Sequence, residues 1–194
     1  MGTRPEAIKM APVVAALRRS APEIETRVAF TGQHTTLVDS VLSAFELEPD
    51  YDLAIMTEGQ SLYDVVGSAL EGLRATVRDF GPEMLLVQGD TATVFTGSLV
   101  GFFEGVKVGH VEAGLRSGDK RAPFPEEVLR RLTDVIADLH FAPTRGARDL
   151  LLQENAPAHG IHVTGNTVVD ALQAVAAMDR PVENEELRDV LEDG

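Results

Sequence analysis

The sequence predicts a doubly wound α/β fold, in which helices cover both faces of a Rossmann-like parallel sheet. Short apolar runs such as Met84–Val87 alternate along the chain with longer segments of helical periodicity. These runs are continuous and lack the polar alternation of a sheet that faces water on one side. Gln88 and Gly89 close the run at 84–87, which indicates a strand end that leads into a loop.

Each element in the first half of the chain has a local signal. A helix from Pro5 to Arg19 has apolar residues at helical spacing and begins at a capping box formed by Thr3 and Glu6. The other expected elements are a strand over 27–30, a helix over 35–45, an irregular or extended stretch over 48–57, a helix over 60–80 and a strand over 84–87.

The second half continues the alternation of helix and strand. Pro125, Glu126 and Glu127 mark a helix start, because proline suits the first turn and acids favour the positive end of the helix dipole. The expected elements are a helix over 91–103, a strand over 106–111, a helix over 125–137, a strand over 139–142, a helix over 144–154, a strand over 162–163 and a helix over 167–178.

Both ends of the sequence differ from a complete Rossmann-like domain. Such a domain feeds its first helix from a central strand through a glycine turn, so we expect that strand to be missing before Gly2. Residues 1–175 are assigned to the Rossmann-like domain. Residues 176–194 are rich in acids and lack a strong apolar stripe, which favours an acidic linker or a terminal helix.

Composition limits the classes of protein. With 194 residues and 44% hydrophobic content, the chain is long enough for one domain with a sizeable core. The absence of cysteine excludes disulfides and thiolate metal sites and favours the cytosol. A net charge of -14 argues against nucleic acid, whose binding needs Lys and Arg contacts to phosphate. With no targeting segment or membrane span in the sequence, we expect a cytoplasmic protein without a membrane partner.

The segment richest in chemically able side chains is GHVEAGLRSGDKRAPFPEE, residues 109–127. Glu112 follows a strand and Glu126 opens a helix, so the two carboxylates are placed in different environments, as acid/base chemistry requires. Arg116 lies between them in the sequence. The alternative is structural, with Glu126 capping its helix and the charges forming surface salt bridges.

Three other places have residues suited to a ligand. Arg4 at the first helix N-terminus and Lys9 about one turn inside favour a phosphate, unless both are ordinary exposed charges of an amphipathic helix. Asp90 follows a strand, where it serves as a general acid or base, a hydroxyl ligand or a helix cap. His34 also follows a strand, within reach of a ligand at the same sheet edge.

Other histidines and arginines have narrower interpretations. His110 lies within an apolar strand, which favours a packed, hydrogen-bonded side chain. Arg130 and Arg131 are adjacent on a helix, so one of them at most faces a site. We expect no metal site, because the remaining histidines lack the spacing of metal ligands: His140, His159 and His162.

Six motifs recur in order from Gly2 to about Gln173: GTRPEAIKM, TGQH, QGDT, GHVEAGLRSGD, FPEE and VTGNTVVDAL. This ordered set closely resembles the non-hydrolysing UDP-N-acetylglucosamine 2-epimerases. The resemblance implies the first of two Rossmann-like domains that face each other across a cleft, the glycosyltransferase-B arrangement. It also implies an isomerase that interconverts UDP-GlcNAc and UDP-ManNAc without a metal or nicotinamide cofactor, through loss of the C2 proton and of UDP and their re-addition.

The resemblance also implies roles for individual residues. Asp90, Glu112 and Glu126 match the three carboxylates implicated in catalysis, and a positioned base is needed because the C2 proton is weakly acidic. Cations stabilise the departing diphosphate. The candidates for substrate binding are Arg4, Lys9, His34, Arg116 and Arg130.

The sequence also departs from the family pattern. Leu129 stands where the family's PEExNR motif has asparagine, which removes an amide able to orient a carboxylate or substrate. In the family a second domain supplies most nucleotide contacts. We expect that domain to be missing here, and the isolated chain to be nearly inactive without it or a partner chain. A homodimer is implied by the resemblance. The alternatives are a non-catalytic remnant or dimerisation module of the same family, and a glycosyltransferase-like or hydrolysing relative.

Overall fold

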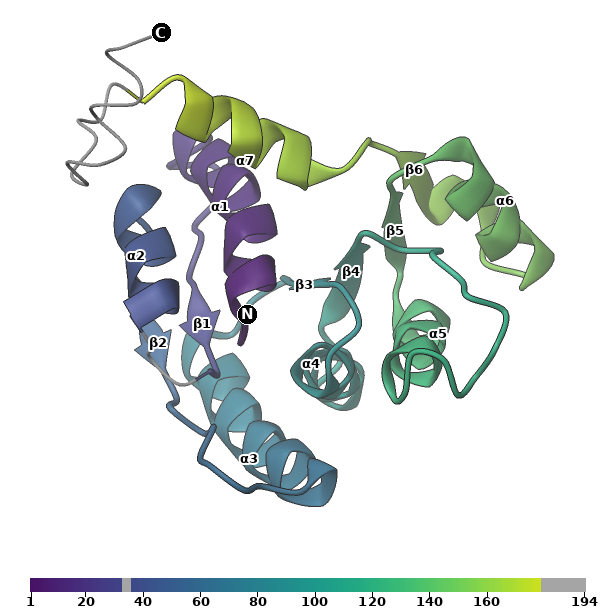
Figure 1. Cartoon of the computed structure of the whole chain (residues 1–194), viewed down its shortest axis with the longest axis horizontal. Helices are drawn as coiled ribbons and strands as arrows, with labels where there is room; N and C mark the ends of the chain where they lie inside the picture. Colours follow the sequence, from purple (N-terminus) through teal and green to yellow (C-terminus); the bar gives the residue numbers. More distant parts are fainter. Residues whose placement is uncertain (33–35, 179–194) are drawn as a thin grey trace, which may run out of the picture.

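The computed structural model describes residues 1–32 and 36–178, which form a parallel α/β domain (Figure 1). Helices α3, α4 and α5 lie along one side of the strands, while α1, α2 and α7 lie on the other. The elements are α1 Arg4–Arg19, β1 Ala29–Phe30, α2 Thr36–Ala44, β2 Tyr51–Asp52, α3 Leu62–Phe80, β3 Met84–Gln88, α4 Ala92–Phe103, β4 Lys107–Val111, α5 Glu126–Ile136, β5 Leu139–Ala142, α6 Arg145–Gln153, a 3-10 turn Ala158–Gly160, β6 Ile161–Val163 and α7 Thr167–Ala176.

All strand pairings among the described residues are parallel, which confirms the predicted fold class. The strands form two sheets, β1–β2 and β3–β4–β5–β6. In the larger sheet Leu86 pairs with Gly109, and His110 pairs with His140. The two sheets are separated between β1 and β3, the point at which a continuous doubly wound sheet has a central strand.

Local capping explains where several helices begin and end. Thr3 caps α1 by accepting a hydrogen bond from the Glu6 amide, while the Glu6 carboxylate accepts from the Gly2 amide at 2.6 Å. Ser61 forms a reciprocal capping box at the start of α3, and Gly81 ends that helix in the left-handed conformation. The predicted capping box at Thr3 is therefore present, except that the Glu6 carboxylate accepts from the amide of Gly2 instead of that of Thr3.

The core lies on both sides of the strands. Phe30 of β1 is fully buried against the α1 face that includes Ala7 and Val14. On the other side Leu73 of α3 packs with Val100 of α4. Such two-sided burial is the reason that the strands consist of continuous apolar runs.

The predicted elements are all found, with changed boundaries. The strand expected at 27–30 is shortened to Ala29–Phe30, and the stretch expected to be irregular or extended contains the short strand β2. His34 and residues 179–194 lie outside the described residues, so most of the expected acidic linker does too. Within residues 1–32 and 36–178, none of the helices has the length and apolar character needed to cross a membrane.

Candidate functional site

Glu112 is the most highly coordinated carboxylate at the carboxyl edge of the sheet. It follows β4 and accepts hydrogen bonds from Lys9 Nζ at 2.6 and 2.8 Å. Gln88 Nε2, at the end of β3, donates to it at 2.6 Å, and Asn166 Nδ2, at the N-cap of α7, donates at 2.8 Å. Strand ends and helix starts that are distant in sequence thus converge on one carboxylate, as expected for the ligand edge of an open α/β sheet.

The backbone of Glu112 is held in an uncommon conformation. Its φ of 69° lies in the left-handed region, which L residues other than Asn and Asp rarely adopt. The Glu112 and Ala113 amides both donate to the Phe141 carbonyl, at 3.0 and 3.2 Å, so β5 fixes this turn. Strained backbone of this kind clusters at active sites and ligand clamps.

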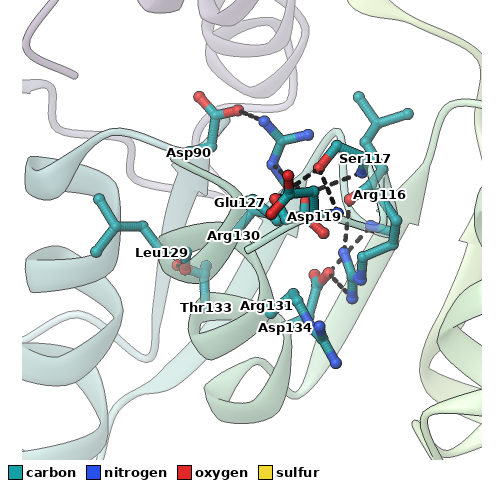
Figure 2. Close-up of polar contacts among 12 residues, drawn as sticks. Asp90, Arg116, Ser117, Asp119, Glu127, Leu129, Arg130, Arg131, Thr133 and Asp134 are labelled. Carbon is teal, nitrogen blue, oxygen red and sulfur yellow. Dashed lines mark hydrogen bonds and ion pairs between the residues drawn. The ribbon is translucent and has the colours of Figure 1, made fainter. Parts of the chain in front are cut away.

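A second carboxylate and cation pair joins the loop after β3 to helix α5 (Figure 2). Arg130 of α5 binds Asp90, which follows β3, at 2.5 Å. Glu127, one turn before Arg130, is fully buried and accepts a hydrogen bond from the Ser117 amide at 3.0 Å. The loop that leads into α5 is therefore tied to the same helix that presents Arg130 to Asp90.

Several groups at this edge have incomplete hydrogen bonding. Gln88 Oε1, Glu127 Oε1 and Arg130 Nε are buried and have no hydrogen-bond partner within the described part of the chain. Buried polar atoms are satisfied in most native proteins, so such a concentration indicates a place where a ligand or solvent completes the network. Glu127 and Arg130 also approach each other, with 3.7 Å between Oε2 and Nε.

Below the site, a buried ionic group supports the loop after β4. Asp134 of α5 accepts from His110 Nδ1 at 2.6 Å and from the Gly114 amide at 3.1 Å, and it binds Arg116 at 2.8 Å. Burial alone raises the pKa of Asp134, but the His110 hydrogen bond and the Arg116 guanidinium outweigh it and hold the pKa below its ordinary value. His110 is thus a packed, hydrogen-bonded histidine, as predicted.

Arg116 forms ion pairs with two carboxylates. Besides Asp134 it binds Glu154 at 2.6 Å, and only 6% of the Arg116 side chain is exposed. The hydrogen bond from Arg116 holds the pKa of Glu154 below its ordinary value. Arg116 orders the loop in this geometry, and its assignment to substrate binding stays a prediction.

The other predicted site residues occupy different positions at the same edge. Arg4 is exposed at the start of α1, and Glu126 is half-buried at the first position of α5. Arg130 faces Asp90 whereas Arg131 binds Glu154, so one of the two arginines faces the site, as expected. His34 is outside the described residues.

Leu129 does not take part in this network. Figure 2 shows its side chain pointing away from the Arg130 guanidinium and from Asp90. The departure from asparagine at this position therefore leaves the Asp90–Arg130 pair intact.

Sequence reasoning missed three residues of the site. Gln88 and Asn166 contact Glu112, and Glu127 is buried instead of lying free in the first turn of α5. Gln88 is the last residue of β3, and Asn166 is the N-cap of α7 in the loop after β6. Both positions are signals that predict a place at this edge.

The described residues hold no group of three or more His, Asp or Glu side chains arranged to bind a metal. What the edge offers instead is acid and base groups beside cations, with helix N-termini around them. The fold is that of a Rossmann-like α/β domain, and carboxylates lie beside cations at the carboxyl ends of β3 and β4.

Comparison with known proteins specifies the family. A family model described as UDP-N-acetylglucosamine 2-epimerase matches residues 15–193. The UDP-N-acetylglucosamine 2-epimerase of Bacillus subtilis is 54% identical over 171 residues, 88% of this chain and 45% of the relative. That of Escherichia coli is 48% identical over 190 residues, 98% of this chain and 50% of the relative. The chain belongs to the UDP-N-acetylglucosamine 2-epimerase family, as the motifs indicated.

Solved structures agree with this assignment. The crystal structure of UDP-GlcNAc 2-epimerase from Neisseria meningitidis bound to UDP-GlcNAc matches with a TM-score of 0.86 and 47% identity. The match covers 89% of this chain and 46% of that one. The chain thus spans about half the length of the relatives that it matches.

Proposed function

We propose that the chain provides one wall of the active site of a UDP-N-acetylglucosamine 2-epimerase, an isomerase acting on UDP-GlcNAc and UDP-ManNAc. The observation that supports this most is the convergence of Lys9, Gln88 and Asn166 on the carboxylate of Glu112, whose backbone is left-handed. The relatives that match most of this chain are named for that activity, and one was crystallised with UDP-GlcNAc.

The residues suit a reaction in which the C2–H and C1–O bonds of the sugar break. A base takes the C2 proton, the C–H electron pair forms the C1=C2 bond of 2-acetamidoglucal, and UDP leaves with the C1–O electron pair. Return of UDP to C1 and of a proton to the other face of C2 gives the epimer. The reaction needs a base, an acid for the opposite face, and cations for the leaving diphosphate.

We assign the first proton transfer to Glu112. In the described structure its oxygens are occupied by Lys9 and two amide donors. A diphosphate that attracts Lys9 would free the Glu112 oxygens to reach the C2 proton. Lys9 therefore links substrate binding to the position of the base.

Asp90 and Glu126 are assigned to the opposite face of C2. Arg130 orients Asp90, while Glu126 lies on the same helix face as Arg130, four residues earlier. Arg4 is exposed at the start of α1, where the helix N-terminus and a cation together favour the diphosphate. The binding roles of His34 and Arg116 stay predictions.

We further propose that activity requires the half of the enzyme that the relatives have and this sequence does not cover. A single wall neither excludes water nor surrounds a nucleotide sugar, so we expect the chain alone to be nearly inactive. The same proposal includes a homodimer, a cytoplasmic location and independence from added cofactors. Size-exclusion chromatography with light scattering tests for the homodimer.

The test measures epimerisation of UDP-GlcNAc by proton NMR. The chain is assayed alone and together with the remaining half of the Bacillus subtilis relative, expressed as a separate polypeptide. We expect turnover in the mixture and not with either half alone. The exposed variant Glu25→Gln is the matched control and should retain turnover, since Glu25 contacts Arg27 away from the site. A well-folded mixture without turnover would favour the alternative, a non-catalytic interaction module.

A further inference from the structure

His110 is a buried histidine to which the proposed chemistry gives no role. It lies in β4, is 1% exposed, and pairs with Val87 of β3 and with His140 of β5. Both of its ring nitrogens are hydrogen-bonded, Nδ1 to Asp134 Oδ1 at 2.6 Å and Nε2 to the Gly89 carbonyl oxygen at 2.8 Å. The ring therefore bridges helix α5 and the turn that follows β3.

The two acceptors decide the direction of these hydrogen bonds. A backbone carbonyl only accepts, so Nε2 of His110 has to carry a hydrogen. The other oxygen of Asp134, Oδ2, takes the Gly114 amide and the Arg116 guanidinium, and Oδ1 accepts from Nδ1 in the same way. His110 thus donates from both ring nitrogens, and Asp134 fixes the ring while the opposite nitrogen holds Gly89.

The turn at Gly89 has few other restraints. Its φ of 89° lies in the region that glycine adopts readily, and no atom lies within 4 Å of a Cβ built there, so side chains do not confine the turn. The Gly89 amide donates to the Val111 carbonyl at 3.2 Å, which is longer than the hydrogen bond from His110. The bond from His110 is therefore the tighter of the two that hold this residue.

The Gly89 carbonyl belongs to the same planar peptide group as the nitrogen of Asp90. Its position therefore sets where the Asp90 backbone begins. The Asp90 side chain is held separately, by Arg130 at 2.5 Å (Figure 2). Arg130 and Asp134 lie four residues apart on α5 and share one face of that helix. Helix α5 thus holds Asp90 twice, at the carboxylate directly and at the backbone through His110.

A second buried histidine shows that burial alone does not explain the contact with Gly89. His140 is also 1% exposed, and its Nε2 donates to the backbone carbonyl of Asp134 at 2.8 Å. Its Nδ1 has no hydrogen-bond partner in the described part of the chain. Both histidines are therefore buried beside Asp134, and His110 is the one of the two that reaches the turn before Asp90.

We propose that His110 is a positioning residue for Asp90: held by Asp134, it fixes the Gly89 peptide and so places the Asp90 carboxylate for proton transfer at the second face of C2. This inference rests on the proposed function, in which Asp90 and Glu126 serve that face. Displacement of a catalytic group by about 1 Å costs about a hundredfold in rate. Loss of the hydrogen bond to Gly89 should therefore impair protonation at the second face and spare proton removal by Glu112.

Two substitutions separate the two hydrogen bonds of His110. The amide nitrogen of glutamine lies as many bonds from Cβ as the histidine Nε2 does, so His110→Gln keeps a donor for Gly89. The amide nitrogen of asparagine matches Nδ1 instead, so His110→Asn keeps a donor for Asp134 alone. A merely structural role through Asp134 makes asparagine the better replacement, whereas positioning of Asp90 makes glutamine the better one.

The first readout is a ratio of two products. The chain, complemented with the remaining half of the Bacillus subtilis relative, is incubated with UDP-GlcNAc in deuterated buffer. NMR then compares the UDP-ManNAc formed, which reports protonation of the second face, with the deuterium at C2 of the remaining UDP-GlcNAc, which reports proton removal by Glu112. A smaller folded fraction lowers both quantities equally, so it leaves the ratio unchanged.

We expect His110→Asn to lower this ratio at least about tenfold and His110→Gln to change it by less than about twofold. The matched control is His140→Asn, at a histidine that is equally buried and contacts Asp134 without reaching Gly89. It should keep the wild-type ratio. Should His110→Asn fail to fold, Gly89→Ala disfavours the φ of 89° without creating a close contact, and it must lower the ratio instead.

The second readout needs no activity, because it measures amide hydrogen exchange of the chain alone. The Gly89 amide should exchange at least about tenfold faster in His110→Asn than in His110→Gln, since the turn opens more often without its bond to His110. Protection of the amides in β5 reports that each variant is folded.

Several results would overturn the proposal. One is a wild-type ratio in folded His110→Asn, and another is a greater loss in His110→Gln than in His110→Asn. Equal exchange of the Gly89 amide in the two variants would also contradict it. A wild-type mixture that forms no UDP-ManNAc would refute the proposed function, and the exchange rates of the Gly89 amide would still decide whether His110 holds this turn.

Discussion

Replacement of Asp134 by asparagine is expected to destabilise the domain strongly. Asp134 is only 6% exposed. Its carboxylate accepts hydrogen bonds from His110 and the Gly114 amide and pairs with the Arg116 guanidinium, at distances of 2.6 to 3.1 Å. Asparagine keeps the shape but places an NH2 group against donors, and Arg116 keeps only its partly exposed partner Glu154. Breaking one partner of a buried ion pair costs about 3–5 kcal/mol.

Urea denaturation followed by circular dichroism measures this change. We expect Asp134→Asn to lower the free energy of unfolding by about 3–5 kcal/mol, which lowers the melting temperature by roughly 10 °C in a domain of this size. The control is Asp149→Asn, whose carboxylate is 59% exposed beside Arg148 and should have no measurable effect. A loss below about 1 kcal/mol in Asp134→Asn would refute a supporting role for this network.

The same variant gives a pH test. The folded-state pKa of Asp134 is depressed, so its contribution is present above the unfolded pKa of about 3.9 and is lost as the pH falls through the folded value. The difference in stability between the wild-type chain and Asp134→Asn should therefore be largest near neutral pH and shrink below about pH 4. A difference that grows in acid would contradict this assignment.

Further stability predictions use the same denaturation assay. Gly114→Ala should cost more than about 2 kcal/mol, because φ is 83° and the new Cβ would lie 2.4 Å from the Ala147 carbonyl oxygen. Gly118→Ala, with φ of 82° and open space, should cost about 1 kcal/mol, and equal losses at both glycines would exclude the close contact as the cause. Leu151→Ala, at a residue that is 1% exposed, should cost about 2–5 kcal/mol, whereas Leu172→Ala, at 68% exposure, should be nearly neutral.

The fold class was predictable because its signals are local. Continuous apolar runs identify strands buried on both faces, and caps such as Thr3 and Ser61 identify helix starts. The very short strands β1 and β2 were harder, since two residues give almost no periodicity. Their position is set by pairing with each other and by packing under α1, which are long-range effects.

The candidate site residues could be chosen one by one from the sequence, and their roles stay predictions, but their arrangement could not be predicted. Lys9 and Glu112 were each chosen for their place at a helix start or strand end, yet their contact joins residues 103 positions apart. The sequence spacing could not show that Arg116 pairs with the buried Asp134. Nor could it show that Glu127 is buried and accepts a hydrogen bond from the Ser117 amide. Which partner each charged side chain takes depends on the desolvation and pairing of charges in the folded domain.

The most direct test of the proposed chemistry is deuterium incorporation at C2 of UDP-GlcNAc in deuterated buffer. The chain, complemented with the remaining half of the Bacillus subtilis relative, should exchange the C2 proton, and Glu112→Gln should reduce that rate by at least about a hundredfold, the usual contribution of a general base. The Glu25→Gln control should exchange at the wild-type rate. Exchange that persists in Glu112→Gln at the wild-type rate would contradict the assignment of Glu112 as the group that removes the C2 proton.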